Sequence, residues 1–306
     1  MQYFAEGLLA IIICAAISST EATAQQVVPL YKGSVPNSRP VNSPEVFENA
    51  WGGMTVRNVT VPTMTVYLPD PDKSVHSGVI IFPGGGYYLE AYETEGIRIA
   101  EAFVKQGVAA FVVRYRLPTD STMVDKSIGP LEDAQQAIMI VRESAASWGL
   151  DTNKIGIMGF SAGGHLASTA GTHFNKAFIS DKSGISLRPD FMILAYPVIS
   201  MTDKLAHMGS RDFLLGKNPS DSLIDFFSGE MNVTNETPPT FLIQAEDDET
   251  VSPENSIVFY QALMRHHVPS ELVMIPKGGH GFAARISAEK WMQPLRSWMR
   301  DNGWMK

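Results

Sequence analysis

The chain has 306 residues, of which 44% are hydrophobic and 18% are charged, and its formal net charge is -8. This apolar fraction excludes wholesale disorder and a collagen-like repeat, and the acidic balance argues against a nucleic-acid-binding protein, which would carry a basic surface. A single cysteine can form neither an intramolecular disulfide nor a cysteine-rich zinc site, and we expect no metal site.

Residues 8–19 form an apolar run that is too short to span a bilayer as a helix. Ala22-Thr23-Ala24 follows, the small-x-small pattern at which signal peptidase cuts. The residues before the run include no Lys or Arg, which is unusual, and a buried N-terminal helix is the alternative. We expect residues 1–24 to be a cleaved signal peptide and the mature chain to be secreted or periplasmic. Cys14 would leave with the signal, so the mature chain would have no cysteine.

Residues 25–46 are rich in Pro, Ser and Asn and predict an extended N-terminal arm. Residues 54–59 and 63–67 alternate polar and apolar side chains, which predicts two antiparallel strands. Short apolar runs then alternate with longer amphipathic runs, the pattern of a mostly parallel α/β sheet flanked by helices. The further strands are expected at 79–82, 109–115, 154–160, 191–196, 240–245 and 271–275, and the helices at 92–105, 130–148, 162–170, 253–266 and 287–301.

Residues 199–239 interrupt this alternation and are too long for a plain connection between two elements. They predict a small insert after the sixth strand, over one end of the sheet. We find no internal repeat and no low-complexity segment. The simplest interpretation is one α/β domain over residues 47–306.

A candidate nucleophile lies where a predicted strand meets a predicted helix, in Gly159-Phe160-Ser161-Ala162-Gly163. A G-x-S-x-G turn at such a junction lifts the serine hydroxyl out of the sheet, and its strained backbone tolerates only small neighbours. The Ala162 N–H, at the helix N-terminus, would point toward an oxygen that becomes negative during attack. The alternative is a phosphate-binding turn or a Gly/Ser-rich helix start. Because a predicted strand precedes the motif and a predicted helix follows it, we favour Ser161 as nucleophile.

A serine hydroxyl needs a base to take its proton, and histidine is the usual one. Only His280 stands in a glycine-rich loop directly after the last predicted strand. His165 is expected to pack within a helix start, whereas His266 and His267 end a helix and are expected at the surface. His207 lies in the insert, where it could pack the loop or contact substrate.

The histidine in turn needs a carboxylate that holds its tautomer and stabilises the imidazolium. Four acids follow the strand at 240–245, and loops of this kind place the acid three positions before an apolar residue such as Val251. This spacing selects Asp248, with Asp247 as the alternative. The chain order Ser161, Asp248, His280 is that of the α/β-hydrolase fold.

A second oxyanion donor is expected after the strand at 79–82, where Pro83-Gly84-Gly85-Gly86-Tyr87 lies. Glycines let backbone N–H groups approach a substrate carbonyl, which favours Gly85 or Gly86 as the donor beside Ala162. Tyr87 and Tyr88 could wall the acyl or sugar site, or could equally serve ordinary packing.

With these motifs the chain resembles the α/β-hydrolase superfamily over nearly all of residues 79–304. More narrowly it is similar to the secreted bacterial esterases labelled acetylxylan esterase or xylanase-associated esterase. The resemblance implies hydrolysis of short acyl esters, commonly acetyl groups on hemicellulose, by a Ser-His-Asp triad without a cofactor. Pro83 stands where hormone-sensitive-lipase-like relatives carry His, which separates the chain from them. The segments that carry the resemblance are 83–87, 115–118, 159–165, 196–198, 207–211, 214–216 and 278–282.

Two other functions compete with the esterase hypothesis. A serine exopeptidase of the prolyl-oligopeptidase type shares the fold and triad, but it would carry a large N-terminal domain where this sequence predicts an arm. A catalytically inactive, carbohydrate-binding scaffold would not need Ser161, Asp248 and His280 together with an oxyanion loop. The expected partner is a small ester or an acylated oligosaccharide, with the acyl group, the sugar and the oligomeric state left open.

Overall fold

The computed structural model describes residues 26–180 and 184–306, so the expected signal peptide lies outside the described residues. In this part of the chain, no helix is long and apolar enough to cross a membrane.

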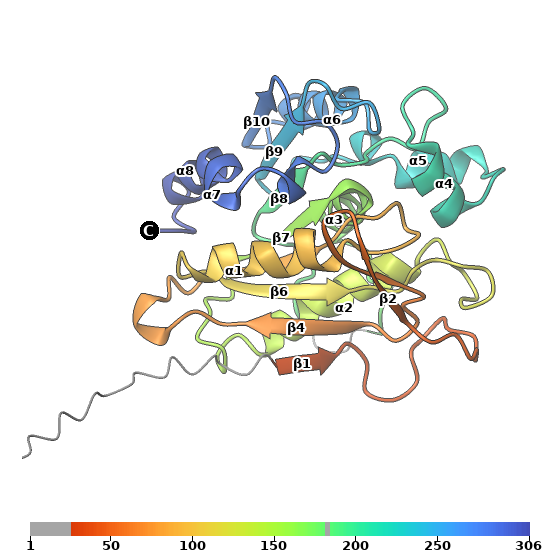
Figure 1. Cartoon of the computed structure of the whole chain (residues 1–306), viewed down its shortest axis with the longest axis horizontal. Helices are drawn as coiled ribbons and strands as arrows, with labels where there is room; N and C mark the ends of the chain where they lie inside the picture. The colour runs from red at the N-terminus through yellow and green to blue at the C-terminus, as the bar shows by residue number, and fades with distance from the viewer. Residues whose placement is uncertain (1–25, 181–183) are drawn as a thin grey trace, which may run out of the picture.

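An eight-stranded, mostly parallel sheet forms the centre of the molecule (Figure 1). Its spatial order is β1-β4-β6-β5-β7-β8-β9-β10, in which β1 and β4 run antiparallel to their neighbours and the other pairs are parallel. This confirms the predicted α/β class. The strands are β1 (Gln26–Pro29), β4 (Thr63–Tyr67), β5 (Gly78–Phe82), β6 (Ala109–Arg114), β7 (Ile155–Phe160), β8 (Met192–Ala195), β9 (Thr240–Ala245) and β10 (Ser270–Ile275).

Helices cover both faces of the sheet, which explains why the central strands are continuously apolar. The α2 and α3 helices pack together on one face, and α1 contacts α7 on the other. Every residue of β5, β7, β8 and β9 is buried. The helices are η2 (Tyr92–Ile97), α1 (Arg98–Val104), α2 (Gly129–Glu143), α3 (Ser161–Thr172), α6 (Glu254–Arg265), α7 (Ala288–Trp291) and α8 (Gln293–Asp301), with short turns η1 (Pro71–Lys73) and η4 (Phe282–Ala284).

The predicted N-terminal arm, residues 25–46, contains one short strand near its start and is otherwise almost entirely irregular. The β1 strand pairs with β4 and forms an edge of the main sheet. A separate hairpin joins β2 (Val46–Ala50) to β3 (Gly53–Arg57). The predicted pairing of residues 54–59 with 63–67 is therefore wrong: β4 has both its edges occupied, by β1 and β6, and β3 takes β2 as its partner.

The insert lies between β8 and β9, over the carboxyl ends of the parallel strands (Figure 1). It consists of α4 (Met208–Leu215), α5 (Asp221–Phe227) and the short turn η3 (Gly229–Met231). Because β1 and β2 add two strands near the N-terminus, the insert follows the eighth strand rather than the sixth. Its predicted position over one end of the sheet is confirmed.

A buried ion-pair cluster ties the N-terminal segment to the sheet and to α2. The Arg116 side chain is almost fully buried, and its Nη2 lies 2.8 Å from Asp133 Oδ1 and 2.9 Å from Glu132 Oε2. Its Nη1 donates to the Pro36 carbonyl at 2.6 Å, and the Tyr31 hydroxyl donates to Asp133 at 3.0 Å. Long-range contacts therefore hold this segment in place.

We expect Asp133→Ala to lower the free energy of unfolding by about 3–5 kcal/mol, because the guanidinium of Arg116 would stay buried without its main partner. Urea unfolding followed by tryptophan fluorescence measures the change. The matched control is Asp120→Ala, which breaks an exposed pair with Lys126 and should cost less than about 1 kcal/mol. Equal costs for the two variants would contradict this assignment.

Candidate active site

Ser161 stands at the junction of β7 and α3 with a left-handed backbone, at φ 51°. The turn is tight enough that glycine is needed two residues after the serine: a Cβ on Gly163 would lie 2.1 Å from the carbonyl oxygen of Phe82. The side chain of Ser161 reaches a cavity at the carboxyl ends of the strands. The structure therefore has the strand–turn–helix geometry of a nucleophile elbow.

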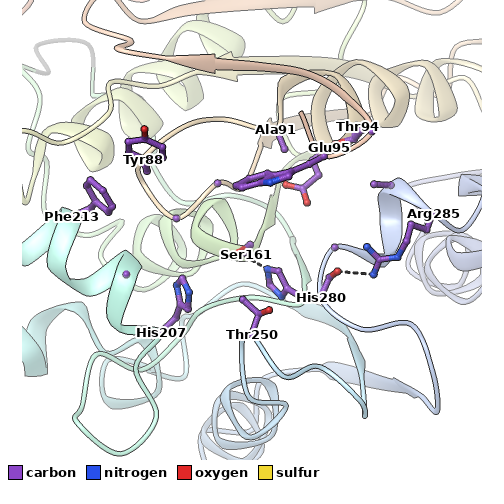
Figure 2. A pocket seen from close by; sticks show the side chains of 17 residues that line it. Tyr88, Ala91, Thr94, Glu95, Ser161, His207, Phe213, Thr250, His280 and Arg285 are labelled. Carbon is purple, nitrogen blue, oxygen red and sulfur yellow. Dashed lines mark hydrogen bonds between the residues drawn. The ribbon is translucent and has the colours of Figure 1, made fainter. Parts of the chain in front are cut away.

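His280 reaches Ser161 from the loop after β10. Its Nε2 lies 2.9 Å from Ser161 Oγ, a contact drawn in Figure 2, and its Nδ1 lies 2.8 Å from Asp248 Oδ2. Because a carboxylate can only accept, Nδ1 carries the proton and Nε2 is free to accept from the serine hydroxyl. An imidazole held in this way can take the proton of Ser161.

The carboxylate of Asp248 is held by four hydrogen bonds. Oδ1 accepts from the N–H groups of Thr250 and Val251 at 3.0 and 2.9 Å, and Oδ2 accepts from Gln244 and His280. Burial acts to raise the pKa of Asp248, but the bonds from His280 and the two N–H groups outweigh it and leave the pKa below its usual value. Asp248 is thus ionised at neutral pH.

Asp247, the alternative acid, has a different role. Its Oδ1 accepts the N–H groups of Gly278 and Gly279 at 2.8 and 2.7 Å, and these bonds hold its pKa below the usual value. The two neighbouring carboxylates thus have separate partners, since Asp248 contacts the His280 ring, whereas Asp247 holds the loop that carries this ring.

The loop after β5 brings Gly85 and Gly86 to the cavity beside Ser161. Gly85 has φ 136°, and a Cβ there would lie 2.0 Å from the carbonyl oxygen of Leu89, so the loop needs glycine. Within the described residues, the N–H groups of Gly85, Gly86 and Ala162 donate to no protein acceptor. Three backbone donors are therefore available near the serine, as an oxyanion site requires.

Glu95, on η2, is a buried carboxyl that sequence reasoning missed. Its Oε2 accepts the Gly84 N–H at 2.7 Å and its Oε1 accepts the Tyr196 hydroxyl at 2.9 Å, while the Tyr196 ring packs edge-on against His280. Burial raises its pKa above the usual value, against the lowering effect of these bonds. Glu95 thus links the glycine loop to the surroundings of the histidine. A single acid in an amphipathic run carries no sequence signal for this role.

We expect Glu95→Ala to lower kcat by about tenfold to a hundredfold, because the glycine loop would lose the acceptor that positions it. The buried Gly84 N–H and Tyr196 hydroxyl would each lose their partner, at about 1–3 kcal/mol of unfolding free energy apiece. Steady-state hydrolysis of p-nitrophenyl acetate gives kcat. Glu101→Ala, at an exposed site on α1, is the control and should match the wild type. Unchanged kcat in Glu95→Ala would refute the positioning role.

The two tyrosines after the glycine loop have opposite environments. Tyr87 does not line the main cavity: its ring is buried and its hydroxyl donates to His165 Nδ1 at 2.7 Å. His165 Nε2 donates to the Phe227 carbonyl at 2.7 Å, and burial lowers the His165 pKa to about 4, so the ring is neutral. Tyr87 therefore anchors the loop to α3 and lies outside the main cavity, although it also lines a smaller pocket beside that cavity. Tyr88 is exposed and lines the cavity.

His207 lines the cavity and also begins α4, where its Nδ1 accepts the Ser210 N–H at 3.3 Å. His207 thus both caps α4 and borders the cavity. His165 is buried as expected, and His266 and His267 are exposed at the end of α6 as expected.

The cavity has a volume of about 890 Å³ and is open to solvent. Several of the residues that line it were not predicted from the sequence. They include Trp51, Glu95, Phe213 and Arg285, of which Figure 2 labels the last three. Trp51 lies at the tip of the β2–β3 hairpin, and Phe213 belongs to the insert. Among the described residues, no cluster of His, Cys, Asp and Glu could hold a metal ion.

Known proteins similar to this chain include enzymes of xylan breakdown. It is 35% identical over 265 residues to the acetylxylan esterase of Xylanibacter ruminicola, covering 81% of this chain and 52% of that protein. It is 38% identical over 224 residues to endo-1,4-beta-xylanase B of Butyrivibrio fibrisolvens, covering 72% of this chain and 34% of that protein. The chain thus spans about a third to a half of the length of these two relatives.

A solved structure matches over almost its whole length. It is the acetyl ester-xyloside bifunctional hydrolase from Caldicellulosiruptor lactoaceticus, which is 35% identical with a TM-score of 0.77, covering 92% of this chain and 97% of that one. The BD-FAE family model matches residues 64–263, which is well over half of the chain. The chain has the α/β-hydrolase fold and belongs to the BD-FAE family.

Proposed function

We propose that the protein is a secreted serine carboxylesterase that removes short acyl groups, chiefly acetyl, from xylan or its oligosaccharides. The observation that carries the proposal is the hydrogen-bonded series Ser161–His280–Asp248 at a cavity with free backbone N–H groups. Acetyl xylan as the substrate is supported by the names of the relatives, and secretion by the apolar run with its cleavage pattern.

In the proposed reaction, Ser161 Oγ attacks the ester carbonyl while His280 Nε2 takes its proton. The tetrahedral oxyanion accepts hydrogen bonds from Ala162 N–H and from Gly85 or Gly86 N–H. Collapse breaks the bond to the sugar oxygen, which His280 protonates to a hydroxyl as it leaves, and an acetyl-enzyme remains. Water then attacks with His280 as base again, and acetate leaves as Ser161 recovers its proton.

Asp248 stays ionised through this cycle, and its charge stabilises the imidazolium of His280 at each proton transfer. Asp247 and Glu95 touch no reacting atom in this scheme and act by positioning the histidine loop and the glycine loop.

The proposal is tested with purified protein on p-nitrophenyl acetate, butyrate and palmitate, acetylated xylan, methyl ferulate and an aminoacyl amide. We expect the acetate to be the best chromogenic substrate and acetylated xylan to release acetate. Preference for methyl ferulate would change the acyl group of the proposal. Cleavage of the amide alone, or of no substrate, would refute it in favour of a peptidase or a binding scaffold.

A further inference from the structure

A second, smaller pocket lies next to the main cavity and shares part of its wall. The side chains of Tyr88 and Phe213 line both spaces, and their ring centroids are 5.3 Å apart. The second pocket has a volume of about 170 Å³. At about 30 Å³ for a water molecule in the liquid, this is room for about six waters, or for one monosaccharide unit.

Most of the side chains that line the second pocket carry a polar but uncharged group, although apolar atoms make up the larger part of its surface. Of the described residues that line it, none is acidic, basic or a histidine. The hydroxyls of Ser43 and Thr60 have no hydrogen-bond partner within the described chain. A pocket of this kind suits a neutral ligand with several hydroxyls, since it offers donors and acceptors but no counter-charge. Its hydroxyl and amide side chains are Ser43, Asn58, Thr60, Thr119, Ser121 and Thr122.

The wall between the two spaces is an aromatic surface that solvent reaches. Tyr88 is 47% exposed and Phe213 is 38% exposed, and Figure 2 shows the two rings together beside the site of Ser161. The Arg57 Nη1 donates to the Tyr88 hydroxyl at 2.8 Å, and its guanidinium lies 5.6 Å from the ring centre. The Tyr88 ring is therefore held in place before any ligand arrives, which reduces the entropy lost on binding.

An exposed aromatic pair flanked by hydroxyl groups is complementary to a sugar chain, which has both apolar and polar surfaces. The C–H faces of a pyranose are apolar and can cover aromatic rings, whereas its hydroxyls at the ring edge need hydrogen-bond partners. A chain with one unit at Ser161 would cross the Tyr88–Phe213 wall and place a later unit in the second pocket.

We propose that the second pocket is a binding subsite for an unsubstituted, neutral sugar unit of the same chain whose acylated unit lies at Ser161. This inference rests on the proposed function and extends it: the enzyme would favour oligosaccharides long enough to span both spaces over short ones.

Binding to the full chain carrying Ser161→Ala tests the subsite without ester hydrolysis. Isothermal titration calorimetry is run with xylobiose and xylohexaose. We expect xylohexaose to bind about tenfold more tightly, because only the longer chain gains the contacts of the second pocket. Equal affinity for the two sugars, or no binding of xylohexaose, would overturn the proposal.

Two further substitutions locate the binding energy. In the same Ser161→Ala background, Thr60→Val removes one free hydroxyl at nearly constant shape, and Phe213→Ala removes one ring of the wall. Each should raise the Kd of xylohexaose by about fivefold to tenfold. Thr60→Ser, which restores the hydroxyl, and Phe47→Ala, an exposed ring that lines neither space, should stay within about twofold.

The outcomes separate the subsite from the proposed function. Unchanged Kd in both Thr60→Val and Phe213→Ala would refute the subsite even if the wild type releases acetate from xylan. Weakened binding in these variants would support the subsite even if the wild type proved unable to hydrolyse acetylated xylan.

Discussion

Ser161→Ala is expected to lower kcat for p-nitrophenyl acetate by about 10⁴- to 10⁶-fold, because the variant has no oxygen to attack the carbonyl. Backbone N–H groups and the cavity would remain, so residual turnover above the water rate and near-normal substrate binding are expected. Steady-state and single-turnover kinetics measure both quantities.

The matched control is Ser168→Ala, a second buried serine of the same helix, whose hydroxyl donates to the His165 carbonyl at 2.9 Å. It should keep kcat within about twofold, since it removes only one local hydrogen bond. Turnover in Ser161→Ala at the level of this control would show that another group is the nucleophile.

Asp248→Asn is expected to lower kcat by about 10⁴-fold, the scale known for the same substitution in a serine protease triad. The amide has no charge to stabilise the imidazolium of His280, and its NH₂ group could reverse the tautomer that leaves Nε2 free. The measurement is kcat for p-nitrophenyl acetate in wild type and variant at the same pH.

Asp247→Asn is the neighbouring control. Its side-chain oxygen can still accept the N–H groups of Gly278 and Gly279, so the loop keeps its position and kcat should fall by no more than about tenfold. If Asp247→Asn were the more damaging of the two, the assignment of the acid would be reversed.

Local patterns predicted the parts of the site that depend on neighbours in sequence. The turn around Ser161 needs small residues at its own flanks, and the loop after the last strand needs glycines around His280, so both carry a local pattern. The parallel sheet then brings the strand ends together. The choice of Asp248 over Asp247 is harder, and spacing to Val251 was the one local guide.

Contacts between distant segments explain what the sequence did not predict. Trp51 reaches the cavity because the β2–β3 hairpin packs on η2, and the edge strand β1 forms because β4 leaves one side open; neither partner is visible in a local pattern. Tyr87 and Tyr88 look alike in sequence, yet the left-handed turn at Tyr87 sends its ring toward His165 on α3.

The most direct test of the central claim is covalent labelling with diisopropyl fluorophosphate, followed by peptide mass mapping. The reagent forms a stable phosphoryl ester with an activated serine and releases fluoride. The account predicts one adduct per chain, on the peptide that contains Ser161, in proportion to the loss of esterase activity. Activity lost with the adduct on a different residue, or labelling that leaves activity intact, would contradict it.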